Sequence, residues 1–323
     1  MGEVHRPLKV LSVVGAGRSG TTVLASILGE IEGFASAGEL RWLWQRAVRD
    51  GRPCGCGRVA TQCPVWSPVI TTTLASMASR TPPKTLQDVI LAQHELIGRR
   101  NVARVIRSVN DAENNWEALQ LVREVTRSAF MGFAEVTGAR VVVDTSKRPL
   151  DAAVMASLEE IDHFVLHIVR DPRAVVHSWR RSKTFTAEGQ TREMGTRGLA
   201  STVGRWMENS VSAEALRRGL PASRWLYMAY EDFATEPRLW IDRIVSFVGE
   251  HGRGPFTDDH HVLLRPNHIV VGNPNRFTTG PVAIQSDDEW HRGMSRRDQA
   301  LVKFLTMPVN LRFRYPQRAQ RQA

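Results

Sequence analysis

The sequence of 323 residues contains few lysines, only three cysteines and no long apolar run. Because no stretch of 18 apolar residues occurs, we predict no membrane-spanning helix. The first apolar strand begins within ten residues of Met1, which leaves no room for a secretory signal peptide. The three cysteines cannot all pair with one another, and they fit a reducing compartment. We therefore expect a cytoplasmic protein.

Basic residues outnumber acidic ones, and nearly all of them are arginines. The net charge of +10 and the pI near 10.3 favour an acidic ligand, nucleic acid or an anionic surface as partner. Lysine stands at only five positions among 43 basic residues, so a lysine at a candidate site carries extra weight. The tail over 308–323 is basic, and we predict a frayed, solvated end rather than a nucleic-acid-binding arm. No nucleic-acid partner is expected.

Residues 8–28 combine an apolar run, a glycine-rich turn and a helical pattern, and they read LKVLSVVGAGRSGTTVLASIL. The apolar run predicts a parallel strand buried on both faces. Gly15, Gly17 and Gly20 allow the backbone to turn sharply and to approach a ligand closely. Thr21 begins a helix whose free N–H groups face the turn. The stretch therefore predicts an anion site, most often for phosphate.

The turn is close to the nucleotide-triphosphatase loop, G-x-x-x-x-G-K-[ST], but it lacks the lysine. Gly15, Gly20 and Thr22 match that pattern, whereas Thr21 occupies the lysine position. An NTPase needs this lysine and a magnesium ion to offset the charge of a triphosphate. Arg18 lies inside the loop instead, so the residues favour a phosphate cradle without the triphosphate machinery. A P-loop kinase or another nucleotide-binding protein remains the alternative.

Two further predicted strands lead to charged side chains. The segment FASAGEL predicts a short strand ending at Glu39, and a β–loop–α–β unit would make it the neighbour of the first strand. Another buried strand covers 141–143 and leads to Lys147. Ligands of open α/β sheets bind at the carboxyl edge, so both side chains are candidates for a site there. The alternatives are a helix-start carboxylate for Glu39 and a solvated surface lysine for Lys147.

The segment HFVLHIVRDPRAVVHSW predicts a third buried strand followed by a helix. Asp171 can cap this helix, and Pro172 suits its first position. Arg170 at the strand end offers a planar fork of donors for phosphate, and Ser178 adds a hydroxyl two turns along the helix. His177 suits packing or a phosphate contact better than catalysis.

Two of these motifs, GRSGTT after a buried strand and RDPR-x-x-x-x-S, resemble the 5′-phosphosulfate loop and the 3′-phosphate motif of sulfotransferases that use 3′-phosphoadenosine 5′-phosphosulfate (PAPS). The chain looks like a bacterial sulfotransferase similar to the tyrosylprotein and carbohydrate sulfotransferases. The resemblance implies the P-loop-containing sulfotransferase fold, an α/β fold with a mainly parallel central sheet flanked by helices, in one domain over 1–323. Residues 68–137 have a helical apolar period and are expected to form a helical insertion that covers the acceptor site.

The resemblance also implies roles for individual residues. The donor-binding residues would be Gly17, Arg18, Ser19, Gly20, Thr21 and Thr22 for the 5′-phosphosulfate, and Arg170 and Ser178 for the 3′-phosphate. Tyr230 would lie near the nucleotide, with core packing as the alternative. The segment H-x-x-x-G-N-P-x-R-F would add Gly272, Asn273 and Arg276 to the donor site.

For catalysis, the resemblance makes Glu39 the general base. Arg18 and Lys147 would stabilise the charge that develops on the leaving phosphate. No metal is expected in this reaction. The acceptor would offer a hydroxyl or an amine, as in a carbohydrate, a glycolipid, a tyrosine or a secondary metabolite, and the sequence does not choose among them.

The three cysteines, Cys54, Cys56 and Cys63, form a C-x-C-x6-C pattern in a stretch rich in glycine and proline. A zinc site needs a fourth ligand, and we expect none nearby, since the next histidine along the chain is His94. We interpret the pattern as a reduced, loop-ordering cysteine cluster, with metal binding as the alternative. Similar cysteine loops occur in bacterial sulfotransferase-like sequences.

The rest of the chain alternates between loops and regular elements. We predict a polar loop over 184–197 and a long helix over 199–218. The segment RWLYMAYEDF predicts a fourth strand, and a helix should follow over 237–248.

Overall fold

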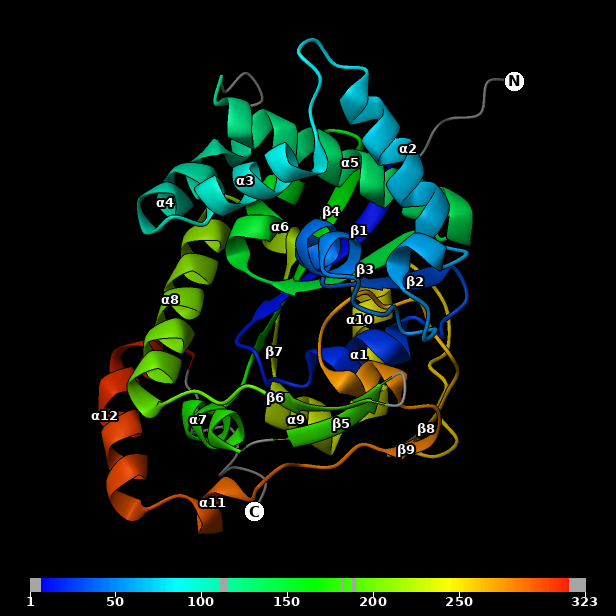
Figure 1. Cartoon of the computed structure of the whole chain (residues 1–323). Coiled ribbons are helices and arrows are strands. Elements are labelled where there is room, and N and C mark those ends of the chain that lie inside the picture. The colour runs from blue at the N-terminus through cyan, green and yellow to red at the C-terminus, as the bar shows by residue number, and fades with distance from the viewer. Residues whose placement is uncertain (1–6, 111–114, 182, 188–189, 314–323) are drawn as a thin grey trace.

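A computed structural model describes residues 7–110, 115–181, 183–187 and 190–313. At its centre lies a five-stranded parallel sheet with the strand order β2-β3-β1-β4-β7 (Figure 1). The strands are β1 (Leu8–Gly15), β2 (Phe34–Gly38), β3 (Val141–Lys147), β4 (Ile161–Val169) and β7 (Trp225–Ala229). The predicted α/β fold with a mainly parallel central sheet is confirmed.

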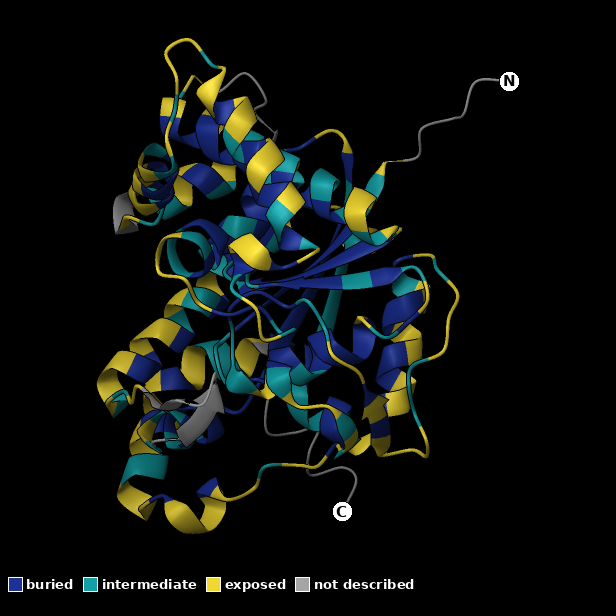
Figure 2. Cartoon of the chain, turned by 45° about the vertical axis from the view of Figure 1, so that its right-hand side comes forward, coloured by how far each residue is buried: buried dark blue, intermediate teal, exposed yellow. Residues whose placement is uncertain are grey.

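The central strands are buried on both faces (Figure 2). In β1, Val10 and Val14 join the apolar core on one face of the sheet, whereas Leu11 and Val13 join the core on the other face. Successive side chains of a strand point to opposite faces, so one continuous apolar run supplies both cores.

Helices cover both faces of the sheet and one of its ends (Figure 1). One face carries α2 (Trp66–Ala78), α3 (Leu86–Leu96), α4 (Arg99–Arg107), α5 (Glu117–Thr137) and α6 (Pro149–Ala156). The other face carries α1 (Thr21–Leu28), α9 (Tyr230–Thr235) and α10 (Pro237–Phe247). A third group packs together beside the sheet: α7 (Pro172–Arg180), α8 (Leu199–Arg218), α11 (Trp290–Gly293) and α12 (Arg296–Phe313).

Residues 68–137 fold into the four helices α2 to α5, with local signals at their ends. Thr85 and Asp88 form a capping box at the start of α3, which satisfies backbone N–H groups that the helix leaves unpaired. Gly138 ends α5 in the left-handed conformation, with a φ of 67°. No helix among the described residues is both long enough and apolar enough to cross a bilayer.

The position of β2 in the sheet differs from the prediction. β2 pairs with β3 rather than with β1, so β3 lies between the first two strands of the chain. A crossover helix fixes the parallel direction of the two strands that it joins, but it leaves open how many strand positions it spans. This order brings Glu39, just after β2, beside the end of β3.

Two segments that we predicted to lack regular secondary structure contain strands or helix. The polar segment 184–197 contributes β6 (Gln190–Met194) and most of β5 (Lys183–Ala187), an antiparallel pair joined through 188–189, which lie outside the described residues. Polar strands can pair because their ladder is made by the backbone.

The tail expected to be frayed over 308–323 is helical as far as Phe313, because α12 continues to that residue. Val302 and Thr306 of this helix are fully buried, and Arg312 forms an ion pair of 3.0 Å with Glu214 of α8. These contacts dock the helix against its neighbours. Residues 314–323 lie outside the described residues.

Candidate active site

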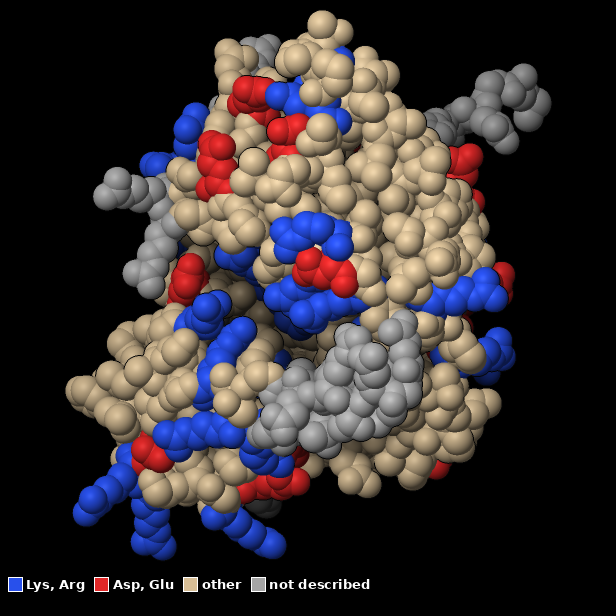
Figure 3. All heavy atoms as spheres, viewed as in Figure 1, with Lys and Arg blue, Asp and Glu red and all other residues tan. Residues whose placement is uncertain are grey.

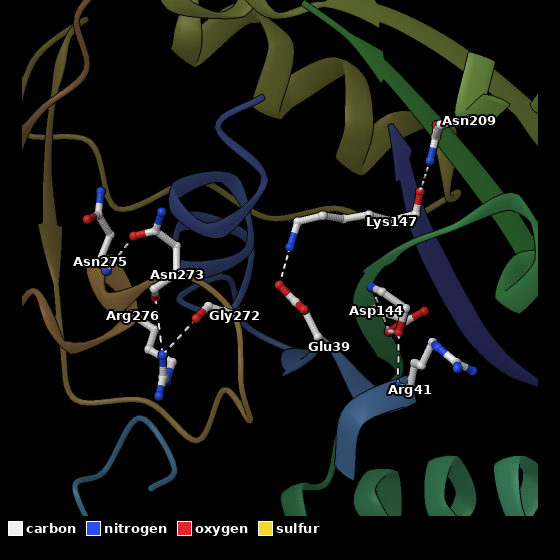
Figure 4. A network of polar contacts seen from close by, with 10 residues as sticks. Glu39, Arg41, Asp144, Lys147, Asn209, Gly272, Asn273, Asn275 and Arg276 are labelled. Carbon is white, nitrogen blue, oxygen red and sulfur yellow. Dashed lines mark hydrogen bonds and ion pairs between the residues drawn. The ribbon is translucent and has the colours of Figure 1, made fainter. Parts of the chain in front are cut away.

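The carboxyl ends of β2 and β3 bring two predicted catalytic side chains together. Glu39 follows β2, and Lys147 is the last residue of β3. The Lys147 ammonium forms an ion pair with the Glu39 carboxylate across 108 residues of sequence (Figure 4). The Lys147 and Glu39 side chains are 17% and 12% exposed, so the pair is shielded from bulk water and still reachable by a substrate.

A buried polar network supports the backbone on which this pair stands (Figure 4). The backbone N–H of Arg41 donates to Ser146 Oγ at 3.1 Å, and Ser146 Oγ donates to Asp144 Oδ1 at 2.6 Å. Burial raises the pKa of Asp144 to about 7. From α8, Asn209 Nδ2 donates to the Lys147 carbonyl at 3.0 Å. These contacts hold the ends of β2 and β3 in register.

Non-glycine residues with positive φ gather at this edge. Among the described residues they are Arg18 at 73°, Lys147 at 71° and Val271 at 55°. Such conformations cost on the order of 1–3 kcal/mol each, and they persist where the surrounding structure holds them for a function. Arg18 and Lys147 are predicted catalytic residues, and Val271 precedes Gly272, a predicted donor-site residue.

The glycine turn between β1 and α1 is closely packed against aromatic rings. A Cβ atom at Gly20 would lie 2.7 Å from the Tyr230 ring, and one at Gly17 would lie 3.1 Å from the Trp179 ring. Ser19 is fully buried, and its Oγ has no hydrogen-bond partner among the described residues. A buried hydroxyl without a partner is costly unless a ligand completes it, so Ser19 fits an anion bound in the turn.

The start of α1 also suits an anion. Gly20 occupies the N-cap position with a φ of 73°, and the first turn contains no acidic side chain. Thr21 and Thr22, the first two residues of the helix, are both buried. The N–H groups at this end are oriented toward the turn, where the helix dipole favours negative charge.

Arg170, at the end of β4, connects the predicted 3′-phosphate motif to the glycine turn. Its Nη1 donates to the Arg18 carbonyl at 2.6 Å, and its Nη2 lies 3.0 Å from Asp287 Oδ2. The guanidinium stacks over Tyr230, 4.3 Å from the ring centroid. Arg170 is buried, and its Nε has no hydrogen-bond partner among the described residues.

The helix α7 after Arg170 begins as the sequence predicts. Asp171 Oδ1 accepts a hydrogen bond of 2.8 Å from the N–H of Arg173, and Pro172 is the first helical residue. Ser178 is buried on this helix. His177 packs against Gly293, where an added Cβ would lie 2.4 Å from the ring, and burial lowers the pKa of His177. The structure therefore places the His177 ring in packing contact with Gly293.

Arginines gather around the turn, and the sequence analysis did not single out most of them. The guanidinium groups of Arg18 and Arg197 lie 4.7 Å and 3.8 Å from the centroid of the Trp179 ring. Burial, together with the nearby charges of Arg205, Arg18 and Arg46, lowers the pKa of Arg197. Burial and the charge of Arg181 likewise lower the pKa of Arg18.

Burial is the largest cause of both lowered pKa values, so the two guanidinium groups are partly shielded from water beside the turn. Figure 3 shows basic side chains around a hollow on this face of the molecule. Trp179 and Arg197 lie on different elements, so no motif in the sequence connects them.

The segment 268–277 lies beside Glu39. The N–H of Glu39 donates to the Val270 carbonyl at 3.0 Å. A Cβ atom at Gly272 would lie 3.3 Å from Glu39 Oε1, so Gly272 provides space beside the carboxylate. Asn273 Oδ1 accepts from the N–H of Asn275 at 3.1 Å and caps a short turn there.

Arg276 has partners other than those of the predicted donor contact. Its Nη1 donates to the Gly272 carbonyl at 3.0 Å (Figure 4). Its Nη2 donates to the Pro53 carbonyl at 3.3 Å. Burial lowers the pKa of Arg276 to about 10. In this structure Arg276 therefore holds the segment 268–277 against the cysteine-containing loop.

Comparison with solved structures finds matches at low sequence identity. The sulfotransferase domain from the Synechococcus PCC 7002 olefin synthase is 18% identical, with 97% of each chain covered and a TM-score of 0.51. The sulfotransferase domain from the curacin biosynthetic pathway is 13% identical, with 93% of this chain and 97% of that chain covered and a TM-score of 0.48. Retinol dehydratase in a complex with retinol and PAP is 14% identical, with 94% and 82% covered and a TM-score of 0.38.

Comparison with curated proteins finds no significant match. A model of the sulfotransferase family, in contrast, matches residues 11–251, which is most of the chain. This span contains the glycine turn, Glu39, Lys147, Arg170 and Ser178. The protein is therefore a member of the sulfotransferase family and an enzyme of that class.

Proposed function

We propose that this enzyme transfers a sulfuryl group from PAPS to a hydroxyl or an amine of an acceptor, with Glu39 as general base. The observation that carries the proposal is the ion pair between Glu39 and Lys147 at the carboxyl edge of the sheet. Lys147 pairs in register with Val14, one residue before the glycine turn, so the ion pair stands beside the predicted donor site. A carboxylate and a cation held together can divide proton removal and leaving-group stabilisation.

The turn and the start of α1 suit the 5′-phosphosulfate end of the donor. Backbone N–H groups at the helix end, the unpartnered hydroxyl of Ser19 and the cation of Arg18 offer hydrogen bonds and positive charge to one anion. Gly17, Gly20, Thr21 and Thr22 complete this cradle.

Arg170 and Ser178 suit the 3′-phosphate. The Nε of Arg170 is available among the described residues, and Ser178 lies on the helix that follows it. Tyr230 stacks between Arg170 and the glycine turn, where it can border the nucleotide. Gly272 and Asn273 belong to a loop that borders the same space, with Arg276 holding that loop in place. Recognition at two phosphates would select PAPS over ordinary adenine nucleotides.

In the transfer step, the acceptor O–H bond breaks and its proton goes to Glu39. The acceptor oxygen bonds to sulfur as the bond from sulfur to the 5′-phosphate oxygen breaks. Lys147 and Arg18 stabilise the charge that develops on the departing phosphate. A sulfuryl group carries less charge than a γ-phosphoryl group, which fits a threonine at the Walker lysine position.

The experiment is a transfer assay with PAPS labelled in its sulfuryl group. Acceptors would come from cell extracts and from panels of carbohydrates, glycolipids, tyrosine peptides and secondary metabolites. We expect label in an acceptor with PAPS and no phosphoryl transfer from ATP with magnesium. Phosphoryl transfer from ATP, with no sulfuryl transfer from PAPS, would favour a P-loop kinase. Tight PAPS binding without transfer to any acceptor would indicate a binding protein.

A further inference from the structure

Three cysteines and one distant histidine converge on a single point outside the active site. The ligand atoms of Cys54, Cys56, Cys63 and His268 all lie within 4.8 Å of one another. His268 Nδ1 is 3.2 Å from Cys63 Sγ, although the two residues are 205 positions apart. The expectation that no fourth ligand lies near the cysteines is therefore wrong. The fold brings it from a segment that sequence spacing cannot reveal.

The separations between Cys63 and its three partners, and that between Cys54 and His268, are close to the edges of a metal-centred tetrahedron. Metal–sulfur bonds of about 2.3 Å place sulfur atoms about 3.8 Å apart, and a metal–nitrogen bond of about 2.0 Å gives sulfur–nitrogen edges of about 3.5 Å. Cys63 Sγ lies 3.7 Å from both Cys54 Sγ and Cys56 Sγ. His268 Nδ1 lies 3.2 Å from Cys63 Sγ and 4.0 Å from Cys54 Sγ.

Hydrogen bonds and close packing hold the backbone on both sides of the cluster. The N–H of Gly57 donates to the Cys54 carbonyl at 2.9 Å, which closes a tight turn. Gly55 leaves room for the other loop, since a Cβ atom there would lie 2.0 Å from Asn267 Oδ1. Trp66 Nε1 donates to the His268 carbonyl at 2.6 Å and fixes the residue that supplies the nitrogen.

The cluster is shielded from solvent. The three cysteines are free of disulfides, and Cys54 and Cys63 are fully buried.

We propose that Cys54, Cys56, Cys63 and His268 bind one Zn²⁺ ion in a closed, structural Cys₃His site. Sulfur-rich tetrahedral sites select zinc among common divalent ions, and four protein ligands leave no position for a substrate. The proposal does not rest on the reaction that the active site performs.

The zinc would hold the segment 268–277, which lies beside Glu39, against the cysteine-containing loop. The Gly55 N–H donates to the Ile269 carbonyl at 3.0 Å, and Val270 forms bridges to both Cys54 and Gly38. The Glu39 N–H in turn donates to Val270. Zinc at His268 would therefore position Val270, two residues further along the segment, beside Glu39.

The first test measures metal in the purified full-length chain after extensive dialysis. We expect about one zinc per chain, most of which is lost in His268→Ala and retained in the control His260→Ala, which removes an exposed histidine. A zinc content that is far below one and unchanged by His268→Ala would overturn the proposal. Stoichiometric iron at these ligands would overturn the assignment to zinc.

Because His268→Ala could impair folding, the second test uses the unaltered chain. X-ray absorption at the zinc edge should show three sulfur ligands at about 2.3 Å and one nitrogen at about 2.0 Å. A shell of oxygen and nitrogen alone would place the metal elsewhere and defeat the proposal. Neither measurement depends on sulfuryl transfer, so its outcome is separate from that of the transfer assay.

Discussion

The guanidinium of Arg170 donates to the backbone carbonyl of Arg18 at 2.6 Å, so the two phosphate motifs touch although they are 152 residues apart. This contact connects the end of β4 with the turn after β1, its neighbour in the sheet. A donor bound between the motifs would meet one continuous hydrogen-bonded surface.

Replacing Arg170 should separate recognition of the two phosphates. We expect Arg170→Ala to weaken binding of adenosine 3′,5′-bisphosphate by about 10- to 100-fold more than binding of AMP, since a hydrogen bond to a charged group contributes roughly 1.5–3 kcal/mol. Titration calorimetry with both nucleotides measures the difference. The control is Arg180→Ala, which removes the guanidinium of α7 that pairs with Asp298. Equal losses for both nucleotides would place the 3′-phosphate elsewhere.

Glu39→Gln should remove the base while keeping the shape of the side chain. We expect the rate of transfer to fall roughly 10²- to 10⁴-fold, with little change in the affinity for adenosine 3′,5′-bisphosphate. Single-turnover kinetics with labelled PAPS give the rate. The matched control is Glu32→Gln at an exposed position. A variant that keeps a tenth or more of the rate would exclude Glu39 as the base.

A methyl group at Gly20 should close the donor cradle. The residue has a φ of 73°, and an added Cβ would meet the Tyr230 ring at 2.7 Å. We expect Gly20→Ala to weaken nucleotide binding and to destabilise the fold by at least about 1 kcal/mol. In Gly204→Ala, within α8 and with open space around it, we expect a slight stabilisation instead. Urea unfolding compares the two variants, and equal behaviour would contradict the packing argument.

The buried carboxyl of Asp144 should make stability depend on pH. Burial raises its pKa to about 7, above the ordinary value of 3.8, so the folded state binds a proton that the unfolded state has released. This contribution is complete below about pH 4 and is lost as the pH rises through 7. Between pH 5 and pH 8, we expect the free energy of unfolding to fall less in Asp144→Asn than in the unaltered protein. The difference should be on the order of a few kcal/mol.

Denaturant unfolding across this range measures the effect of Asp144→Asn. Asp259→Asn, at an exposed carboxylate, serves as control and should follow the unaltered protein. Parallel curves for all three proteins would show that Asp144 does not titrate in this range.

Removing zinc should loosen one part of the chain selectively. In hydrogen exchange after chelation, we expect the amides of Gly55 and Val270 to lose protection. The Gly55 N–H donates to Ile269 across the two fastened loops, and the Val270 N–H joins the fastened segment to Ala37 of β2. Amides in the pairing of β4 with β7 should exchange as before. Uniform loss of protection would indicate global unfolding, and unchanged protection would show that the metal does not hold these loops.

The sequence predicts which helices and strands form better than it predicts which of them lie next to one another. Apolar runs identify the central strands, and the pattern over 199–218 matches α8. Glu39 and Lys147 could be assigned to one edge of the sheet because parallel strands place their ends together. Their contact could not be predicted, because it depends on β2 lying beside β3 instead of β1.

The sequence also did not predict the contacts between loops that are far apart along the chain. His268 reaches the cysteines through a segment whose sequence suggests a turn, and Trp179 receives Arg18 and Arg197 from separate elements. Polar side chains in loops follow no hydrophobic period, so their positions depend on the tertiary fold. Arg276 has a recognisable motif, but its contacts with the carbonyl groups of Gly272 and Pro53 could not be predicted from that motif.

The ion pair of Lys147 with Glu39 has a kinetic consequence. The Lys147 ammonium occupies a carboxylate oxygen of Glu39 that the acceptor hydroxyl would need to reach, and a bound donor would offer that ammonium a phosphate oxygen instead. Substrates should then add in a compulsory order, PAPS before acceptor. Product inhibition would reveal that order, with adenosine 3′,5′-bisphosphate competing against PAPS and the sulfated product failing to compete against it.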